Sequence, residues 1–372
     1  MAMRETSFLC FILVHCVAGQ GGGQSAEIPP LISPTAEISM PQLSINDIVA
    51  PISDHSVDGK TRLLAFGDWG DSRQVHRIDN INKYILSSNP DGILLLGDNF
   101  YPAGIAPELG LADPILELFT NHLANQLPPT IPFYAVLGNN DVLRKTGHFQ
   151  VEFSHIHPNW IMLSDEIFFV RIELSEICIW AINSNSASKS VAAALDVRME
   201  EEINQRSCRW KIFTAHFPMF TAGAYRTTPS VKMFRAFMLP LVRKHSVDFV
   251  ITGHDHTSQV LQVENLHTVF LISGTAVDTR TDSLDRSAEG MATRGAGLVW
   301  GDDSLPNTIL SLEFSNDSAQ YKFLHITDSG EIAELFAGEK NWTPPAYSPE
   351  VMRLASSVSG IIHVEPSGKL DR

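Results

Sequence analysis

The feature that most constrains this chain is one local pattern that recurs five times: a short run of consecutive apolar residues ends at a polar side chain that can bind a metal ion. Runs that are apolar on both faces are typical of buried, largely parallel strands with helices packed against them. The runs are 63–66, 93–96, 133–137, 212–215 and 249–252, and the polar residues that follow them are Asp68, Asp98, Asn139, His216 and His254 with His256.

The polar residues carry information as a set rather than one by one. A single aspartate after a glycine is most often a turn residue, and a single histidine is most often a satisfied polar group. Five such residues at five strand ends are hard to explain as independent turns, and ligands of open α/β sheets gather at the carboxyl ends of the strands. The sequence therefore predicts one shared site.

The residue types in this set indicate the chemistry of the site. Carboxylate, phenolate and imidazole ligands suit iron, manganese and zinc, and the absence of cysteine argues against a structural zinc or an iron–sulfur cluster. A pair of metal ions can clamp a phosphate ester, lower the pKa of a bound water and stabilise the transition state. A carboxylate between the two ions would hold them together, and Asp98 is the natural bridge.

The remaining patterns predict the architecture. Helices are expected between the strands, over residues 75–86 and 231–244. Beyond residue 267, short strands over 268–273 and 308–314 and a hairpin over 320–336 predict an added antiparallel set. We expect an α/β fold made of a two-sheet β-sandwich with flanking helices.

Both ends of the chain differ from the middle. An apolar stretch after Arg4, over residues 8–18, predicts a secretory signal peptide over residues 1–19, because it is too short for a spanning helix. Residues 20–59 have no sustained period and predict a flexible leader, and residues 341–372 predict a C-terminal extension. The catalytic domain is therefore expected over residues 60–340, with no membrane span.

Secretion agrees with the cysteines and the sequons. Removal of the signal peptide would leave Cys178 and Cys208, which could form a disulfide or remain as two buried thiols. Two glycosylation sequons begin at Asn316 and Asn341. We expect a secreted glycoprotein, or one in an endomembrane or lysosomal lumen. The formal net charge of −15 disfavours nonspecific binding to nucleic acid or anionic membranes.

The ordered blocks around these residues resemble those of metallophosphoesterases of the calcineurin-like superfamily. Two of them specifically resemble the low-molecular-weight, tartrate-resistant type of purple acid phosphatase: the block over residues 98–101 and the block over residues 253–256. The resemblance spans roughly residues 63–336 and implies a four-layer αββα fold. The blocks are Gly67-Asp68-Trp69-Gly70, Gly97-Asp98-Asn99-Phe100-Tyr101, Gly138-Asn139-Asn140-Asp141, Ala215-His216-Phe217-Pro218 and Gly253-His254-Asp255-His256.

The resemblance implies a role for each matching residue. Two metal ions per chain are expected, iron paired with iron, zinc or manganese. Asp68, Tyr101 and His256 would complete a ferric site. Asn139, His216 and His254 would complete a divalent site, and Asp98 would bridge the two.

Two positions depart from the family pattern. Where the family has outer-shell histidines that orient phosphate and protonate the leaving group, this chain has Asn140 and Tyr225. An amide cannot release a proton, and a phenol with an ordinary pKa near 10 releases one reluctantly. Good leaving groups, as in aryl phosphates and anhydrides, should therefore be favoured over alkyl phosphates.

These observations lead to one main hypothesis and an alternative from another class. The main hypothesis is an acid phosphatase that hydrolyses small phosphate monoesters by a metal-bound hydroxide at a dinuclear centre. The alternative is a metal-binding pseudophosphatase or scaffold with weak or no turnover, which would predict lost ligands and a C-terminal membrane span. A Ser/Thr protein phosphatase would want a Gly-Asn-His-Glu block and no tyrosine ligand. The sequence makes no prediction about oligomeric state.

Overall fold

The structure is a computed structural model that describes residues 46–50, 59–173, 175–205, 207–287 and 295–343, with the backbone alone for 46–50. All of these residues belong to one compact unit, Gln42–Arg372. The predicted signal peptide over residues 1–19, most of the predicted leader, and residues 344–372 of the predicted extension lie outside the described residues.

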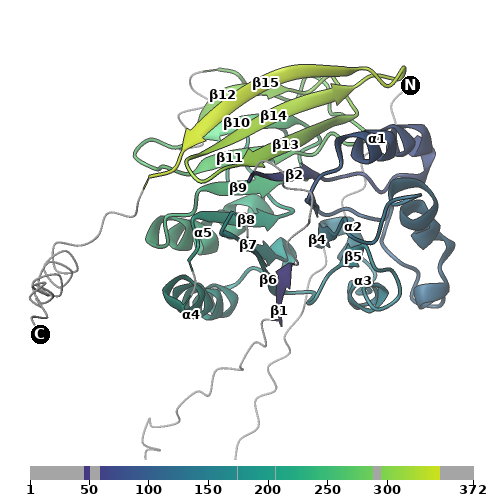
Figure 1. The fold of residues 1–372 in the computed structure, drawn as a ribbon, viewed down its shortest axis with the longest axis horizontal. Helices are drawn as coiled ribbons and strands as arrows, with labels where there is room; N and C mark the ends of the chain where they lie inside the picture. The colour runs from purple at the N-terminus through teal and green to yellow at the C-terminus, as the bar shows by residue number, and fades with distance from the viewer. Residues whose placement is uncertain (1–45, 51–58, 174, 206, 288–294, 344–372) are drawn as a thin grey trace, which may run out of the picture. The chain divides into compact units, whose positions relative to one another are not determined.

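Two mixed β-sheets form the centre of this unit (Figure 1). The larger sheet has eight strands, and β7, β8, β9 and β11 are parallel neighbours within it. In spatial order they are β1 (Asn46–Ala50), β6 (Ile167–Ile172), β7 (Ile177–Ile182), β8 (Trp210–Ala215), β9 (Phe249–Thr252), β11 (Val269–Ser273), β10 (Ser258–Gln262) and β12 (Gly297–Asp302).

The second sheet has seven strands and divides into a parallel and an antiparallel half. The strands β2, β3, β4 and β5 are parallel, whereas β13, β14 and β15 are antiparallel, so the predicted antiparallel set is confirmed for the strand over 308–314 and the hairpin over 320–336. In spatial order they are β15 (Ile332–Asn341), β14 (Ser318–Ile326), β13 (Thr308–Phe314), β2 (Thr61–Phe66), β3 (Gly92–Leu95), β4 (Phe133–Ala135) and β5 (Trp160–Ile161). The strand predicted over 268–273 exists as β11, but it lies in the larger sheet and pairs in parallel with β9 and antiparallel with β10.

The continuously apolar strands are buried on both faces, as β7 illustrates. Its residues Ile177, Ile179 and Ala181 belong to the larger core, which includes side chains of both sheets, whereas Cys178 and Trp180 belong to a second core with helical residues. Successive side chains of a strand point to opposite faces, so both faces must be apolar. This explains why the run has no alternating pattern.

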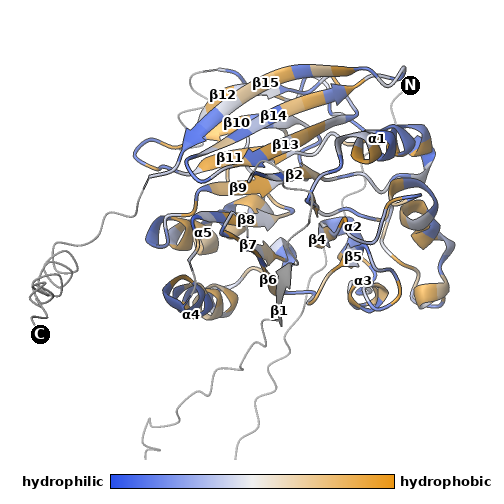
Figure 2. Cartoon of the chain, in the orientation of Figure 1, coloured by the Kyte–Doolittle hydropathy of each residue, from blue (hydrophilic) through white to orange (hydrophobic). Residues whose placement is uncertain are grey.

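The helices lie outside the sheets and bury one face each. Figure 2 shows both hydrophobic and hydrophilic residues along α4 (Lys189–Gln205) and α5 (Pro229–Lys244). Their buried residues, such as Leu195 and Phe234, belong to the second core. On the seven-stranded sheet, α1 (Val75–Ser88) buries Ile78, Ile81 and Ile85 in the larger core. The predicted two-sheet sandwich with flanking helices is confirmed, as are the helices predicted over 75–86 and 231–244.

One short helical segment, the 3-10 turn η1 (Ser72–Gln74), precedes α1, and the others lie between β3 and β8 along the chain. These are the 3-10 turns η2 (Gly110–Ala112), η3 (Pro114–Leu116) and η5 (Ser184–Ser186), the π-helix η4 (Leu118–Leu123), and the short helices α2 (Asn139–Val142) and α3 (His148–Phe153). Among the described residues, no helix is both long enough and apolar enough to cross a membrane.

Six strands were not among the runs singled out in the sequence: β1, β5, β6, β7, β10 and β12. The strand β1 lies within residues 20–59, for which no regular element was predicted, and it pairs in parallel with β6. The antiparallel pair β6 and β7 places a hairpin beside it. Strand pairing between distant segments of a chain depends on the whole sheet, which a local pattern does not encode.

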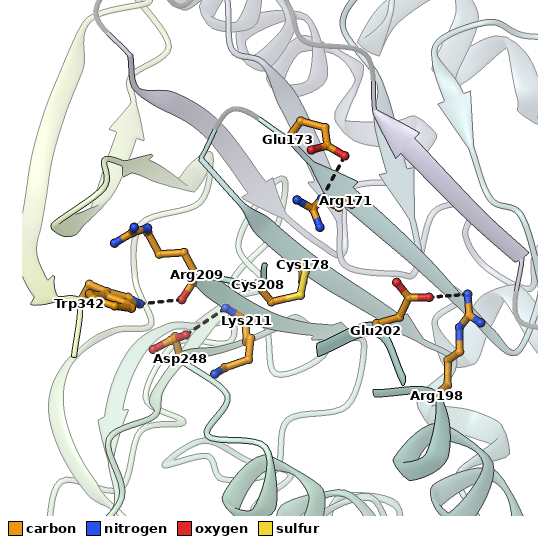
Figure 3. The surroundings of a disulfide bond; sticks show 10 residues. All are labelled: Arg171, Glu173, Cys178, Arg198, Glu202, Cys208, Arg209, Lys211, Asp248 and Trp342. Carbon is orange, nitrogen blue, oxygen red and sulfur yellow. Dashed lines mark hydrogen bonds and ion pairs between the residues drawn. A yellow bond between two sulfur atoms is a disulfide. The ribbon is translucent and has the colours of Figure 1, made fainter. Parts of the chain in front are cut away.

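The two cysteines form a disulfide that ties the start of β7 to the segment before β8 (Figure 3). The Cα atoms of Cys178 and Cys208 are 5.5 Å apart. Next to the bond, the guanidinium carbon of Arg209 lies 4.4 Å from the centre of the Trp342 ring, and the Trp342 indole N–H donates to the Arg209 carbonyl at 3.0 Å. Of the two alternatives left open by the sequence, the structure contains the disulfide.

Candidate metal centre

The predicted site residues lie in the turns that follow parallel neighbouring strands. In the seven-stranded sheet, Asp68, Asp98 and Asn139 follow β2, β3 and β4. In the eight-stranded sheet, His216 and His254 follow β8 and β9. The carboxyl ends of adjacent parallel strands lie at one edge of a sheet, so the topology gathers each group at one edge.

Four of the site residues have a left-handed backbone conformation. The φ angles are 59° at Asp68, 53° at Asp98, 72° at His254 and 45° at His256. This region is unfavourable for residues with a Cβ atom, and such strained positions cluster at functional sites. A hydrogen bond at 3.0 Å from the Asp68 N–H to the Gly97 carbonyl joins two of the turns.

Two close approaches fit the turns together. A Cβ atom on Gly138 would lie 2.1 Å from Oδ1 of Asp98, so only glycine fits there. The Nδ1 atom of His216 lies 2.8 Å from the carbonyl oxygen of Leu96, which can only accept a hydrogen bond. Nδ1 of His216 must therefore carry the proton, and Nε2 is left free to bind a metal ion.

The first group of donor atoms consists of Asp68, Tyr101 and His256. The Tyr101 hydroxyl donates to Oδ1 of Asp68 at 3.2 Å and lies 3.3 Å from Nε2 of His256. Nε2 of His256 is 3.4 Å from the same Asp68 oxygen. One carboxylate oxygen, one phenol oxygen and one imidazole nitrogen thus converge, and this set suits a hard cation.

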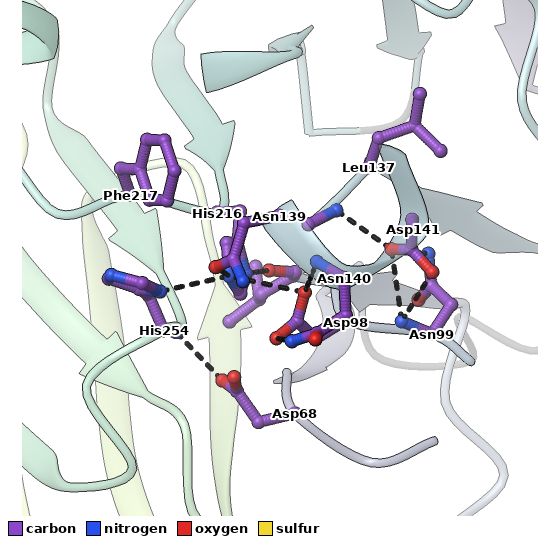
Figure 4. A network of polar contacts seen from close by, with 12 residues as sticks. Asp68, Asp98, Asn99, Leu137, Asn139, Asn140, Asp141, His216, Phe217 and His254 are labelled. Carbon is purple, nitrogen blue, oxygen red and sulfur yellow. Dashed lines mark hydrogen bonds and ion pairs between the residues drawn. The ribbon is translucent and has the colours of Figure 1, made fainter. Parts of the chain in front are cut away.

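The second group consists of Asn139, His216 and His254 (Figure 4). Nε2 of His216 lies 3.0 Å from Oδ1 of Asn139 and 3.2 Å from Nδ1 of His254. The amide oxygen and two imidazoles are donors that suit a divalent ion such as zinc, iron or manganese.

Asp98 lies between the two groups and is buried. Its Oδ1 atom is 3.5 Å from Nε2 of His216, and its carboxylate also contacts the Tyr101 hydroxyl. One donor atom each from Asp68, Asp98 and His216 lie within 4.8 Å of one another. The donor types and their two-sided arrangement around Asp98 fit a pair of metal ions.

The electrostatics of the groups agree with cation binding. Burial alone would raise the pKa of Asp68, but the neighbouring His256 imidazole lowers it below its ordinary value. Burial, followed by the carboxylates of Asp68 and Asp98, raises the pKa of Tyr101. Burial and His216 lower the pKa of His254, which favours the neutral imidazole that a metal ion requires.

A fully buried carboxylate, Asp141, supports the site from behind. It accepts hydrogen bonds from the backbone N–H groups of Gly138, Asn99 and Phe100 and from the Gln150 side chain, at 2.8 to 3.1 Å. Asp141 therefore joins the turn that carries Asp98 to the turn that carries Asn139. Burial, followed by the charge of Asp98, raises the pKa of Asp141 to about 7. The sequence analysis did not predict this supporting role.

The two residues that depart from the family pattern contact different predicted ligands. The Asn140 side chain donates to Oδ2 of Asp98 at 2.5 Å, and its backbone N–H donates to Oδ1 at 2.8 Å (Figure 4). The Tyr225 ring stacks on the His254 ring, with centres 4.2 Å apart and planes 23° apart. Each departing residue thus contacts a predicted ligand.

Comparisons with known proteins agree with the resemblance in the sequence. Residues 61–258 match the calcineurin-like phosphoesterase family. Purple acid phosphatase 4 of Arabidopsis thaliana is 24% identical over 246 residues, which cover 58% of this chain and 68% of that protein. Tartrate-resistant acid phosphatase type 5 of Homo sapiens is 24% identical over 243 residues, covering 56% of this chain and 71% of that protein.

Solved structures share the fold. GAP50, described as the anchor in the inner membrane complex of Plasmodium, is similar with a TM-score of 0.60 at 19% identity, covering 84% of this chain and 99% of that chain. Purple acid phosphatase PPD1 from yellow lupin has a TM-score of 0.55 at 13% identity, covering 75% of this chain and 53% of that chain. Because the family match spans more than half of the sequence and contains all seven predicted ligands, this chain belongs to the calcineurin-like phosphoesterase family.

Proposed function

We propose that this protein is an acid phosphatase that hydrolyses small phosphate monoesters at a dinuclear metal centre. The observation that carries the proposal is the arrangement of six donor side chains, in two groups of three, around the buried carboxylate of Asp98. Family membership supports phosphoesterase chemistry, and the purple acid phosphatase relatives support the narrower assignment.

Each residue has a defined part in the proposal. Asp68, Tyr101 and His256 would hold one ion, iron in the proposed assignment. Asn139, His216 and His254 would hold the second ion, which would be iron, zinc or manganese, and Asp98 would contact both. A bound metal pair supplies water activation and charge neutralisation at phosphorus.

The chain's own residues position these ligands and the substrate. Asp141 fixes the spacing of two turns, and the Leu96 carbonyl orients the His216 ring. Asn139, Tyr101 and His256 are partly exposed, so a phosphate ester in solution can reach their side of the site. The Asn140 amide next to Asp98 would donate a hydrogen bond to the phosphate but cannot release a proton.

The proposed location is a secretory or lysosomal lumen. The disulfide between Cys178 and Cys208 supports an oxidising compartment. Asn316 and Asn341, the acceptors of the two sequons, are both exposed, which supports their glycosylation. Mass spectrometry of secreted protein before and after glycosidase treatment tests this assignment.

One structural similarity favours a second candidate. The likeness to GAP50, which is described as an anchor, supports the hypothesis of a scaffold with weak or no turnover. The complete set of donor side chains supports the enzyme instead, since a scaffold has no need to retain seven ligands.

The experiment that distinguishes the acid phosphatase from the scaffold combines metal analysis, a visible absorption spectrum and turnover of p-nitrophenyl phosphate by the secreted full chain. The enzyme is expected to contain close to two metal ions per chain, at least one of them iron, and to lose turnover in His216→Ala. The matched control is His148→Ala, because His148 is an exposed residue of α3. Metal-replete protein without turnover would support the scaffold.

A further inference from the structure

A half-buried arginine next to the metal centre has no part in the proposed function so far. Arg280 lies in the segment after β11, and its backbone N–H donates to the His256 carbonyl at 3.0 Å. Within the described ranges, no hydrogen bond or ion pair engages its guanidinium. An uncompensated guanidinium retains its charge and its five N–H donors for another group.

The guanidinium is held over the ring of Tyr225. Its central carbon lies 4.5 Å from the centre of that ring, in a cation–π arrangement. The His254 ring also stacks on Tyr225, with its centre at 4.2 Å. Two groups at contact distance over one ring must occupy its opposite faces, because they would otherwise overlap. Arg280, Tyr225 and His254 therefore form three successive layers.

The middle layer is fixed by a buried network. Asp255 accepts a hydrogen bond from the backbone N–H of Tyr225 at 3.4 Å and another from the Thr221 hydroxyl. A Cβ atom on Gly223 would lie 2.3 Å from the Asp255 carboxylate, so this loop packs directly against it. The ring that separates Arg280 from the predicted ligand His254 is consequently held in place.

This arrangement places a positive charge one aromatic ring away from the predicted ligands. Arg280 is also tied directly to the site, because its backbone N–H donates to the carbonyl of the predicted ligand His256. A phosphoryl group bound between the ligands is separated from Arg280 by the Tyr225 ring. A substrate with a second phosphoryl group could extend past that ring to the guanidinium, whose planar fork matches phosphate oxygens.

We propose that Arg280 is a specificity-determining residue that binds the departing phosphate of phosphoanhydride substrates, with Tyr225 as its positioning residue. The inference rests on the proposed function of the same site. In the reaction, the oxygen of water forms a bond to the attacked phosphorus and the water releases a proton to solvent. The anhydride P–O bond breaks, and its electron pair leaves with the second phosphate. That phosphate departs as an anion beside Arg280, so it needs little protonation from Tyr225 or Asn140.

The test compares inorganic pyrophosphate with p-nitrophenyl phosphate in the metal-loaded full chain. In Arg280→Gln, kcat/KM for pyrophosphate should fall about 10- to 100-fold, the value of a hydrogen bond to a charged group. The value for p-nitrophenyl phosphate should fall less than about threefold, because that substrate has no second phosphate. Arg280→Lys keeps the positive charge but loses the planar guanidinium. Its kcat/KM for pyrophosphate should lie between the values of wild type and Arg280→Gln.

The matched control is Arg226→Gln. Arg226 is adjacent to Tyr225 in sequence, but its side chain donates to the Gly223 carbonyl at 3.0 Å and pairs with Asp285 at 3.8 Å. The same loss of charge there should leave the ratio of the two substrates unchanged. The inference is overturned if Arg280→Gln lowers kcat/KM for both substrates by the same factor. It is also overturned if Arg226→Gln changes the ratio of the two kcat/KM values as much as Arg280→Gln does.

A binding measurement separates failure of this inference from failure of the proposed function. Calorimetry of the metal-loaded chain should show pyrophosphate binding about tenfold or more tightly than inorganic phosphate, and Arg280→Gln should abolish the difference. If wild type hydrolyses neither substrate but shows this difference, the proposed function is wrong and the role of Arg280 stands. Equal affinities in wild type would overturn the role of Arg280.

Discussion

The two sheets contribute different chemistry to the candidate metal centre. The turns after β2, β3 and β4 of the seven-stranded sheet carry Asp68, Asp98, Tyr101 and Asn139, which all offer oxygen atoms. The turns after β8 and β9 of the eight-stranded sheet carry the three histidines, which all offer nitrogen atoms. Each predicted ion would therefore take ligands from both sheets, and neither sheet has a complete site by itself.

This division implies that metal binding and the docking of the two sheets are linked. Ligands that come together only in the folded unit stabilise it by binding the native state and not the unfolded chain. The division also separates the two departures from the family pattern. Asn140 lies on the oxygen side, and Tyr225 lies on the nitrogen side against His254.

Removal of both metals should have the largest effect, because it breaks the link between the two sides. We expect a chelator to abolish turnover and to lower the melting temperature by about 5–10 °C, since about 2.7 kcal/mol per site is expected at a hundredfold excess over Kd. Scanning calorimetry measures the shift. His216→Ala protein, which keeps the predicted ligands of the first ion, should show about half of this shift with chelator. An unchanged melting temperature in metal-replete wild type would break the proposed link.

Replacement of the shared carboxylate should have the next largest effect. In Asp98→Asn, we expect both ions to be depleted and kcat/KM to fall more than about 10²-fold, since even indirect supports of a metal ligand contribute 10- to 100-fold. Asp328→Asn, in the exposed turn between β14 and β15, is the matched control. Normal metal content and turnover in Asp98→Asn would show that the two sides do not share this residue.

Histidines introduced at the two positions that depart from the family pattern test the contributions of the oxygen side and the nitrogen side to the rate. Asn140→His combined with Tyr225→His should raise the alkyl phosphate rate about tenfold or more relative to the aryl phosphate rate, because a positioned acid contributes about 10²–10⁴-fold. The two single variants assign the gain to the oxygen side or to the nitrogen side. Steady-state rates with glycerol phosphate and p-nitrophenyl phosphate provide the ratio. An equal rise in both rates would place the effect on binding.

The smallest effect on rate is expected for the phenol of the oxygen side. Tyr101→Phe should retain both metals and most of the turnover but lose the visible charge-transfer band, because the band requires a phenolate on iron. Tyr84→Phe is the matched control, since Tyr84 lies on α1 and packs against the larger core. A colourless wild type with full iron content would contradict the assignment of Tyr101.

The strand ends and the helices were predictable because their signals are local. The α5 helix was predicted to begin at Val231 and begins at Pro229, since proline is tolerated in the first turn. The same local runs placed Asp68, Asp98 and Asn139 at neighbouring strand ends before the strands were paired.

The order of strands and the supports of the site were not predictable in this way. The strand β11 lies between β9 and β10, against the order of the sequence, because pairing depends on distant segments. The contacts of Asp141 and the layers formed by Arg280 and Tyr225 likewise join separate loops. No periodicity within one segment encodes such contacts.

The strand β8 joins the disulfide to the metal centre, which has a consequence for local opening. Cys208 lies just before Trp210 at its start, and His216 follows its last residue, Ala215. Its two edges are bonded to β7 and β9. Amide hydrogens in such a strand exchange with solvent only when a large part of the unit opens. We therefore expect the amides of β8 to exchange last, and those of the exposed β15 to exchange early.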